Sequence, residues 1–321
     1  MTTDPTQDEV LALFDSLSNW GRWGGADVRG TLNHITPAVR AAAAAQVHDG
    51  VTISCALEID PRPGPDFAVL HPPMLRMLET GEGVGNPDRV PSPLARSMGP
   101  RVTYPMEYIG MVFHGSGITH LDGLSHVIWD GRLYNDRPAA TVTAWKGATV
   151  FPITDVPDGI VTRGVLLDLA RWRGVDWLEA GDGPAPDDLD AIAASQAVTI
   201  QTGDAVLLRT GFGRRRKESP PSEPGRPGWR AASLPWLHAH EIALIGADTA
   251  QDATPSGYAD LRQPVHVVGI NAMGLWLLDN ADLEALAETC ARLGRWEFLF
   301  TVAPLRMKGG TGSPVNPLAL F

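Results

Sequence analysis

The chain contains very few cysteines and no long apolar run. Cys55 and Cys290 are the only two among 321 residues, which excludes a disulfide framework and is typical of a reducing cytoplasm. A membrane-spanning helix needs about 18 consecutive apolar residues, and none occurs. The N-terminal residues 1–5 also lack the basic and then apolar segments of a signal peptide. We therefore expect a soluble, cytoplasmic protein with no membrane partner.

Cationic residues are scarce as well. Lys and Arg total 26 against 37 Asp and Glu, so the formal net charge is -11 and the pI about 5.2. Because binding to phosphates requires a basic face, this charge excludes nucleic acid as a partner. The one basic run, residues 214–217, lies in a Pro/Gly-rich stretch. We interpret it as a solvated loop, with phosphate or substrate contact as the alternative.

Linkers and nucleotide-binding glycine motifs are also missing. No long Pro/Gly/Ser linker or internal repeat divides the chain, which predicts one domain over residues 1–321. Short apolar runs alternate with helical periodicity without a dinucleotide-binding glycine fingerprint, which favours an α/β fold with a mixed sheet. Expected strands cover 51–57, 108–113, 164–169, 205–209 and 242–247; expected helices cover 10–17, 37–47, 187–197 and 282–293; a long irregular arm covers about 61–105.

The most informative segment runs from His114 to His126 and reads His-Gly-Ser-Gly-Ile-Thr-His-Leu-Asp-Gly-Leu-Ser-His. In an extended strand alternate side chains share one face, so we expect His114, Ser116, His120 and Asp122 to lie together. Imidazole nitrogen and carboxylate oxygen are ligands that divalent transition metals prefer, and His126 follows one short turn later. The pattern predicts a metal or catalytic site, with a surface cluster of polar residues as the alternative.

These residues resemble a known metal motif. Thr119 followed by His-x-Asp-x-x-x-His is similar to the motif of the cyclase family, which includes bacterial kynurenine formamidase and isatin hydrolase. Other segments resemble the longer members of that family. They are Asn19-Trp-Gly-Arg-Trp-Gly, Gly30-Thr-Leu-Asn33, Trp129-Asp-Gly-Arg-Leu-Tyr-Asn135, Gly203-Asp-Ala-Val-Leu-Leu-Arg-Thr-Gly211 and Gly309-Gly-Thr-Gly-Ser-Pro-Val-Asn-Pro317.

The resemblance implies a fold, an assembly and a site. The fold is a mixed sheet wrapped into a barrel-like core flanked by helices, of the kynurenine formamidase-like, swivelling β/β/α type, in a homodimer or homotetramer. The site holds one or two divalent ions, zinc or manganese, and hydrolyses a C–N bond in a small amide, lactam or imide. By position, His120 and Asp122 match metal ligands, and His126 matches a proton-transferring histidine. His266 and Asp279 resemble the ligands of a second metal.

Two positions depart from the family pattern. Ser116 stands where the family has its first histidine ligand, and Asp279 stands where it has glutamate. A hydroxyl is a poorer zinc ligand than an imidazole, so a single, a weak and an absent metal site are the alternatives. Ser116 is then a loop hydroxyl, a hydrogen-bond donor to a ligand, or a nucleophile activated by a histidine. His114 replaces the missing ligand only if Gly115 and Gly117 bend the chain sharply.

Each assigned residue has a structural alternative. His120 and Asp122 could form a buried hydrogen-bonded pair, and His126 could pack in the core. His266 could be a lone polar residue on an apolar strand, and Asp279 a helix N-cap. A further set of residues, Trp20, Trp23 and Trp129, flanks the matched motifs, where they line either the core or an aromatic substrate pocket.

We predict a metal-dependent hydrolase of a small molecule, with an aromatic or cyclic substrate. Within enzymes, the alternative is a metal-poor relative that hydrolyses a lactone or ester, or catalyses a cyclisation or dehydration, with His126 and Asp122 as acid and base. From a different class, the alternative is a catalytically silent binding protein that lost a ligand at Ser116.

Overall fold

The computed structural model describes residues 4–62, 71–86, 88–99, 101–219 and 225–321. The chain divides into two compact units. The main unit consists of Met1–Leu57 and Ile118–Phe321, and the inserted unit consists of Glu58–Gly117. The single domain that the sequence predicts stays a prediction. In the described part of the chain, no helix combines the length and apolarity that a bilayer crossing requires.

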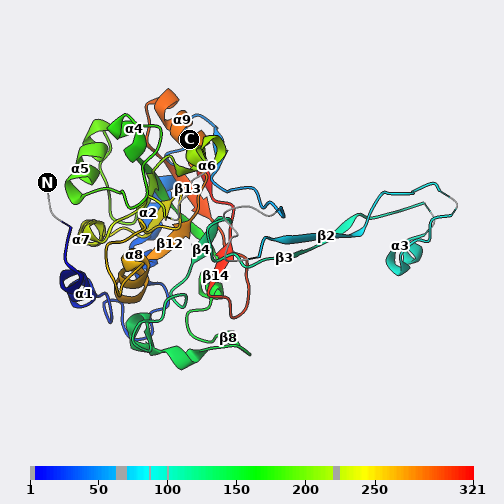
Figure 1. The fold of residues 1–321 in the computed structure, drawn as a ribbon, viewed down its shortest axis with the longest axis horizontal. Coiled ribbons are helices and arrows are strands. Elements are labelled where there is room, and N and C mark those ends of the chain that lie inside the picture. Colours follow the sequence, from blue (N-terminus) through cyan, green and yellow to red (C-terminus); the bar gives the residue numbers. More distant parts are fainter. Residues whose placement is uncertain (1–3, 63–70, 87, 100, 220–224) are drawn as a thin grey trace. The chain divides into compact units, whose positions relative to one another are not determined.

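The main unit is built on a nine-stranded mixed sheet (Figure 1). In their order across the sheet, the strands are β1 (Thr52–Ser54), β15 (Leu318–Leu320), β13 (Glu297–Val302), β9 (Ile160–Asp168), β10 (Ala205–Arg209), β11 (Leu244–Ala247), β12 (Trp276–Asp279), β4 (His120–Asp122) and β14 (Gly312–Pro314). Strands β9 to β12 run parallel, and the other neighbours pair antiparallel. The sheet curls into a half-barrel flanked by helices, which confirms the predicted mixed α/β, barrel-like architecture.

The central strands are apolar on both faces. Every residue of β10, β11 and β12 is buried. Parallel strands covered on both faces require nearly continuous apolar runs, and these are the runs that predicted strands at 164–169, 205–209 and 242–247. Strand β13 differs, because its residues alternate between buried and half-buried.

Helices flank this sheet in the main unit (Figure 1). They are α1 (Gln7–Ser16), α2 (Pro37–Ala44), α4 (Leu169–Arg173), α5 (Pro186–Ser195), α6 (Phe212–Glu218), α7 (Leu234–Ala239), α8 (Pro264–His266), the π-helix η7 (Val267–Met273) and α9 (Glu284–Leu293). The ends of the predicted helices follow their capping residues. Thr36 accepts a hydrogen bond at the start of α2, and Gly294 ends α9 in the left-handed conformation.

Short elements connect the rest of the main unit. They are the 3₁₀ turns η1 (Gly30–His34), η3 (Tyr134–Asp136), η4 (Ala139–Thr141), η5 (Ile153–Asp155) and η6 (Ala231–Ser233), and the strand pairs β5 (Arg132–Leu133) with β6 (Arg137–Pro138) and β7 (Val142–Thr143) with β8 (Gly147–Ala148). Gly30 has a positive φ of 55°, and a Cβ there would lie 2.2 Å from the Gly274 carbonyl oxygen. Only glycine allows this close approach of η1 to the end of η7.

The inserted unit contains more regular structure than the sequence predicts. Strand β2 (Met74–Glu79) pairs antiparallel with β3 (Met106–Gly110), and helix α3 (Pro93–Ser97) lies between them in the chain. The prediction of an irregular arm over 61–105 was therefore wrong for this part. Its basis was the local density of Pro and Gly, whereas the ribbon forms between strands far apart in sequence. Residues 63–70, 87 and 100 of that prediction lie outside the described residues.

Candidate metal and catalytic site

Three of the predicted site residues meet across two paired strands. Strand β4 pairs antiparallel with β12 in a register that sets His120 opposite Asp279. His120 and Asp122 are two residues apart and therefore point to the same face of the sheet, as does Asp279. All three side chains are buried. The pairing explains why a motif near residue 120 and an aspartate near residue 280 belong to one site.

His266 approaches the same carboxylates from helix α8. Its Nε2 lies 3.3 Å from Asp279 Oδ2 and 3.6 Å from Asp122 Oδ2. The Nε2 of His120 lies 3.6 Å from Asp122 Oδ1 and 3.7 Å from Asp279 Oδ2. Imidazole nitrogens and carboxylates thus alternate around a closed ring, which we call the ligand ring. Its members are His120, Asp122, His266 and Asp279. Three of these four distances exceed a normal hydrogen bond, and all four lie within the range of an ion pair.

His126 lies beside the ligand ring and reaches solvent. It follows a tight turn in which its backbone N–H donates to the Gly123 carbonyl. Its Nε2 lies 3.6 Å from Asp122 Oδ2, and its side chain is 28% exposed, whereas that of Asp122 is completely buried. The group that the sequence predicts to transfer protons therefore borders both the buried carboxylate and water.

Both imidazoles of the ligand ring are held through their other nitrogen. His120 Nδ1 lies 2.8 Å from the Ile118 carbonyl oxygen, and His266 Nδ1 lies 2.5 Å from Asp252 Oδ2. A carbonyl or carboxylate oxygen only accepts hydrogen bonds, so each Nδ1 carries the hydrogen and each Nε2 faces Asp122 and Asp279. Sequence reasoning missed Asp252, because a residue fourteen positions before His266 has no ligand-like spacing.

The charges around His266 change its proton affinity. Burial lowers the pKa of this imidazole, but the nearby carboxylates of Asp279 and Asp252 outweigh that effect and hold its pKa well above the usual value. The two carboxylates thus stabilise the charged form of the His266 imidazole.

The ligand ring has the chemistry that a transition-metal ion requires. Zinc takes imidazole nitrogen and carboxylate oxygen at about 2.0–2.2 Å, which puts neighbouring ligand atoms of a tetrahedron roughly 3.4 Å apart. The four distances around the ring, 3.3 to 3.7 Å, match that separation. The ligand atoms of His120, Asp122 and Asp279 lie within 4.8 Å of one another. Among the described residues, Asp279 Oδ1 has no hydrogen-bond partner, although it is buried. These residues fit a divalent ion.

Several local predictions need correction. Residues 114–118 are bends instead of an extended strand, because strand β4 begins only at His120. His266 lies on a helix, and not on an apolar strand. Asp279 ends strand β12, and the oxygen near the start of α9 that accepts from Glu284 N–H belongs to Asp282.

Two predicted site residues belong to the inserted unit. His114 and Ser116 precede Gly117, where that unit ends. Their contribution to the ligand ring, as a replacement ligand and as a catalytic residue, stays a prediction.

The three flanking tryptophans have partners within the main unit. Trp129 stacks on Phe14 with ring centroids 5.0 Å apart, and Trp23 packs edge-on against His34. The Trp20 indole N–H donates to the Asn271 carbonyl on π-helix η7. These contacts agree with packing roles, and the aromatic substrate pocket stays a prediction.

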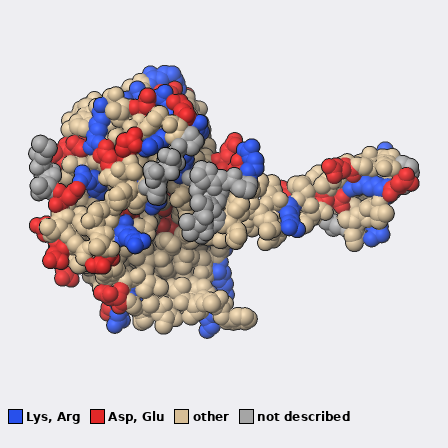
Figure 2. Space-filling model, in the orientation of Figure 1, with Lys and Arg blue, Asp and Glu red and all other residues tan. Residues whose placement is uncertain are grey.

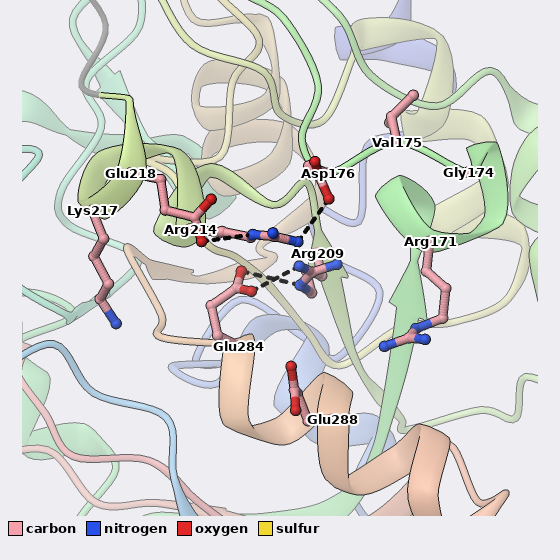
Figure 3. Close-up of a pocket in the computed structure, with 10 residues that line it drawn as sticks. All are labelled: Arg171, Gly174, Val175, Asp176, Arg209, Arg214, Lys217, Glu218, Glu284 and Glu288. Atoms are coloured by element: carbon pink, nitrogen blue, oxygen red, sulfur yellow. Dashed lines mark hydrogen bonds and ion pairs between the residues drawn. The ribbon is translucent and has the colours of Figure 1, made fainter.

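A separate hollow of about 600 Å³ lies among α4, α6 and α9 (Figure 3). Arg209 forms ion pairs there with Glu284 and the buried Asp168, and Arg214 pairs with Asp176 and Glu218 on the surface. The residues of the ligand ring do not line it. The basic run that we expected in a loop is part of helix α6. Its Pro/Gly-rich surroundings misled the prediction, since Phe212 and Gly213 are buried and hold the helix against the main unit.

The fold and the ligand ring define a mixed α/β protein with a buried His/Asp site on a curled sheet. The family described as "Putative cyclase" matches residues 70–252. A crystal structure of a novel cyclase is similar over 96% of this chain and 99% of its own, with 33% identity and a TM-score of 0.84. The chain therefore belongs to the cyclase family, as the sequence motifs indicated.

Two isatin hydrolases share the fold at lower identity. Isatin hydrolase A from Labrenzia aggregata, bound to benzyl benzoate, has 20% identity and a TM-score of 0.58, with 88% of this chain and 96% of that chain covered. Isatin hydrolase A from Ralstonia solanacearum has 18% identity and a TM-score of 0.58, with 89% and 96% covered. No curated protein matches the chain.

Proposed function

We propose that this protein is a metal-dependent hydrolase that cleaves a C–N bond in a small amide, lactam or imide. The ligand ring, with His126 beside it, is the observation that carries the proposal. His120, Asp122, His266 and Asp279 would hold the ion, which is zinc or manganese. When bound, such an ion lowers the pKa of its water to about 7 and polarises a carbonyl oxygen.

The chain's own residues supply the proton transfer. His126 borders Asp122 on one side and solvent on the other, so its imidazole can take a proton and deliver it to the departing nitrogen. Asp122 stabilises the protonated imidazole, since its Oδ2 lies 3.6 Å from His126 Nε2. An amide nitrogen is a poor leaving group unless it is protonated, and His126 is suited to that step.

The substrate that we propose is small, and cyclic or aromatic. The two isatin hydrolases share this fold, so isatin, an aromatic lactam, is a suitable first compound. We further propose that Ser116 and His114 act at the same site, Ser116 by hydrogen bonding and His114 as an additional ligand. Both follow from their positions in the motif that contains His120 and Asp122.

Metal analysis with a substrate panel tests the proposal. Protein purified without chelator should contain stoichiometric zinc or manganese, and it should hydrolyse at least one member of a panel of amides, lactams and imides that includes isatin. Dialysis against a chelator should abolish turnover, and adding back the ion should restore it. Turnover that survives full metal removal would contradict the proposal and favour acid–base chemistry by His126 and Asp122. Metal-free protein that binds panel compounds without turnover would favour a silent binding protein.

We also propose that a second copy of the chain covers the ribbon β2–β3, giving a homodimer. Its exposed apolar side chains are Met74, Leu75, Met77, Leu78, Tyr108 and Ile109, between 48% and 60% exposed. About half of each of these six side chains is exposed, so together they form an apolar surface that a second copy would cover as part of the about 800 Å² per partner of a stable interface. Arg76 and Glu107 on the same ribbon carry opposite charges, which suits a self-complementary contact.

A further inference from the structure

Asp252 is a buried carboxylate that no part of the proposed reaction uses. It lies outside the ligand ring, and its side chain faces the start of helix α8. Asp252 Oδ1 accepts a hydrogen bond of 2.7 Å from the backbone N–H of Val265, and Oδ2 accepts one of 3.1 Å from that of His266. The same Oδ2 lies 2.5 Å from His266 Nδ1. One carboxylate therefore fixes both the backbone and the ring of His266.

Asp252 is connected to the central sheet through Trp229. A β-bridge joins it to Trp229, whose indole N–H donates to the Gly246 carbonyl on strand β11. The backbone N–H of Ala253 donates to the Trp229 carbonyl as well. Asp252 and Trp229 are both fully buried. These contacts connect the segment that carries Asp252 to strand β11 of the central sheet.

We infer that Asp252 is a positioning residue that selects the tautomer of His266 and directs its Nε2 lone pair into the ligand ring. The carboxylate only accepts hydrogen bonds, so the Nδ1 of His266 must donate. The nitrogen left to bind an ion is then Nε2, which lies 3.3 Å from Asp279 Oδ2. A ring free to turn would place either nitrogen there, and ligand preorganisation would be lost.

The inference that this orientation serves metal binding rests on the proposed function. The hydrogen bonds between Asp252 and His266 do not depend on that function. Backbone carbonyl oxygen holds His120 in the same way, and no substitution removes that partner. Asp252 is therefore the place where ligand orientation can be changed by mutation. Outer partners of metal-binding histidines typically contribute a factor of about 10–100 to metal affinity.

The first test needs only the wild-type, metal-free protein. A hydrogen donated over 2.5 Å to a buried carboxylate should give a proton NMR signal far downfield of the backbone amides, coupled to His266 Nδ1. The signal should disappear in His266→Gln and in Asp252→Ala. The hydrogen on Nδ1 should be present whether the ring is neutral or carries a second hydrogen on Nε2. A wild-type ring without a hydrogen on Nδ1 would show that the inference is wrong.

The second test measures Zn²⁺ and Mn²⁺ affinity by competition with a chelating indicator. Asp252→Ala should bind each ion about 10–100 times more weakly than wild type. Asp252→Glu keeps the carboxylate and should recover part of that loss. Asp248→Ala is the matched control, since Asp248 is a similarly buried carboxylate that accepts its hydrogen bonds from Thr210 and Phe212. It should lose stability and keep its metal affinity.

The outcomes separate this inference from the proposed function. If wild type binds metal and Asp252→Ala binds it equally tightly, the inference is overturned while the function stands. If wild type binds no metal, the function fails, and the downfield proton still decides whether Asp252 fixes the tautomer. If Asp252→Ala does not fold, the NMR spectrum of wild type and the affinity of Asp252→Glu decide instead.

Discussion

The two units of this chain treat apolar side chains in opposite ways. In the main unit, the strands β10, β11 and β12 are buried on both faces, and Asp279 at the end of β12 belongs to the ligand ring. In the inserted unit, the ribbon β2–β3 carries large apolar side chains that are about half exposed on both of its faces. Two-stranded ribbons alone are marginally stable in water. The main unit therefore contains its own core, whereas the apolar side chains of the ribbon stay about half exposed.

Charged side chains of both signs lie on the surface of the main unit. Lys, Arg, Asp and Glu are mixed across the visible face of the main unit (Figure 2). The ion pairs of the main unit with exposed or half-buried partners include Arg173 with Asp182 and Arg214 with Asp176. Mixed charges favour solubility and do not attract a polyanion.

The largest expected effect tests whether the ligand ring is one functional unit. Replacing Asp122 by Ala removes the carboxylate that faces His120, His126 and His266. We expect loss of bound metal, measured by elemental analysis, and a fall in turnover of at least about 10³-fold, because the ion contributes several kcal/mol to transition-state stabilisation. Asp158→Ala, an exposed aspartate of the main unit, is the control. Full metal occupancy in Asp122→Ala would contradict the assignment.

The next effect tests the inserted unit. Leu75 and Ile109 lie directly opposite each other on the ribbon. Replacing both by Ser should weaken the dimer by at least about 10³-fold, because each protomer loses two apolar side chains worth about 1.5–3 kcal/mol each when buried. Light scattering after size exclusion, over a range of concentrations, measures the mass. Leu305→Ser, which changes an exposed leucine of the main unit, should leave the dimer intact. A monomeric wild type, or an unchanged mass in the double variant, rules out the ribbon interface.

A smaller effect separates metal binding from proton transfer within the main unit. His126→Ala should reduce turnover by about 10²–10³-fold, the usual contribution of a positioned acid or base. Metal content should not change, since His126 lies beside the ligand ring. His48→Ala, an exposed histidine, should behave as wild type. Unchanged turnover in His126→Ala would end its assigned role.

The smallest effect concerns stability and not chemistry. Arg209 is buried and pairs with Asp168 and Glu284, so Arg209→Met leaves the buried Asp168 carboxylate with the more exposed Arg171 in place of two cationic partners. We expect a loss of about 3 kcal/mol in the free energy of unfolding, measured with urea. Arg214→Met removes a more exposed pair with Asp176 and should cost at most about 1 kcal/mol. Equal losses would show that burial does not set the strength of these pairs.

The sequence predicts the main unit better than the inserted unit for a physical reason. Buried parallel strands consist of local apolar runs, so the strands at 205–209 and 242–247 could be predicted from the sequence directly. Cap signals such as Thr36 also act over a few residues. The ribbon forms between Met74–Glu79 and Met106–Gly110, and pairing over that distance leaves no local signature.

The candidate site shows the same division. His120, Asp122 and His126 lie within seven residues, so their motif can be recognised in the sequence. His266 and Asp279 were found only by resemblance, and Asp252 was missed altogether. An oxygen that orients a ligand can come from any residue that the fold brings near, including a backbone carbonyl such as that of Ile118. Residue type and spacing carry no information about such partners.

The pairing of β12 with β4 has a consequence for how this protein reaches its native state. Asp279 shares a face with His120 only in the observed alignment of the two strands. A slip of one residue would turn the aspartate to the opposite side of the sheet and break up the ion-binding set. A metal ion bound by the ligand ring would then stabilise only the chains in which β12 and β4 are correctly aligned. The ion would favour the native strand register in addition to its proposed part in the reaction.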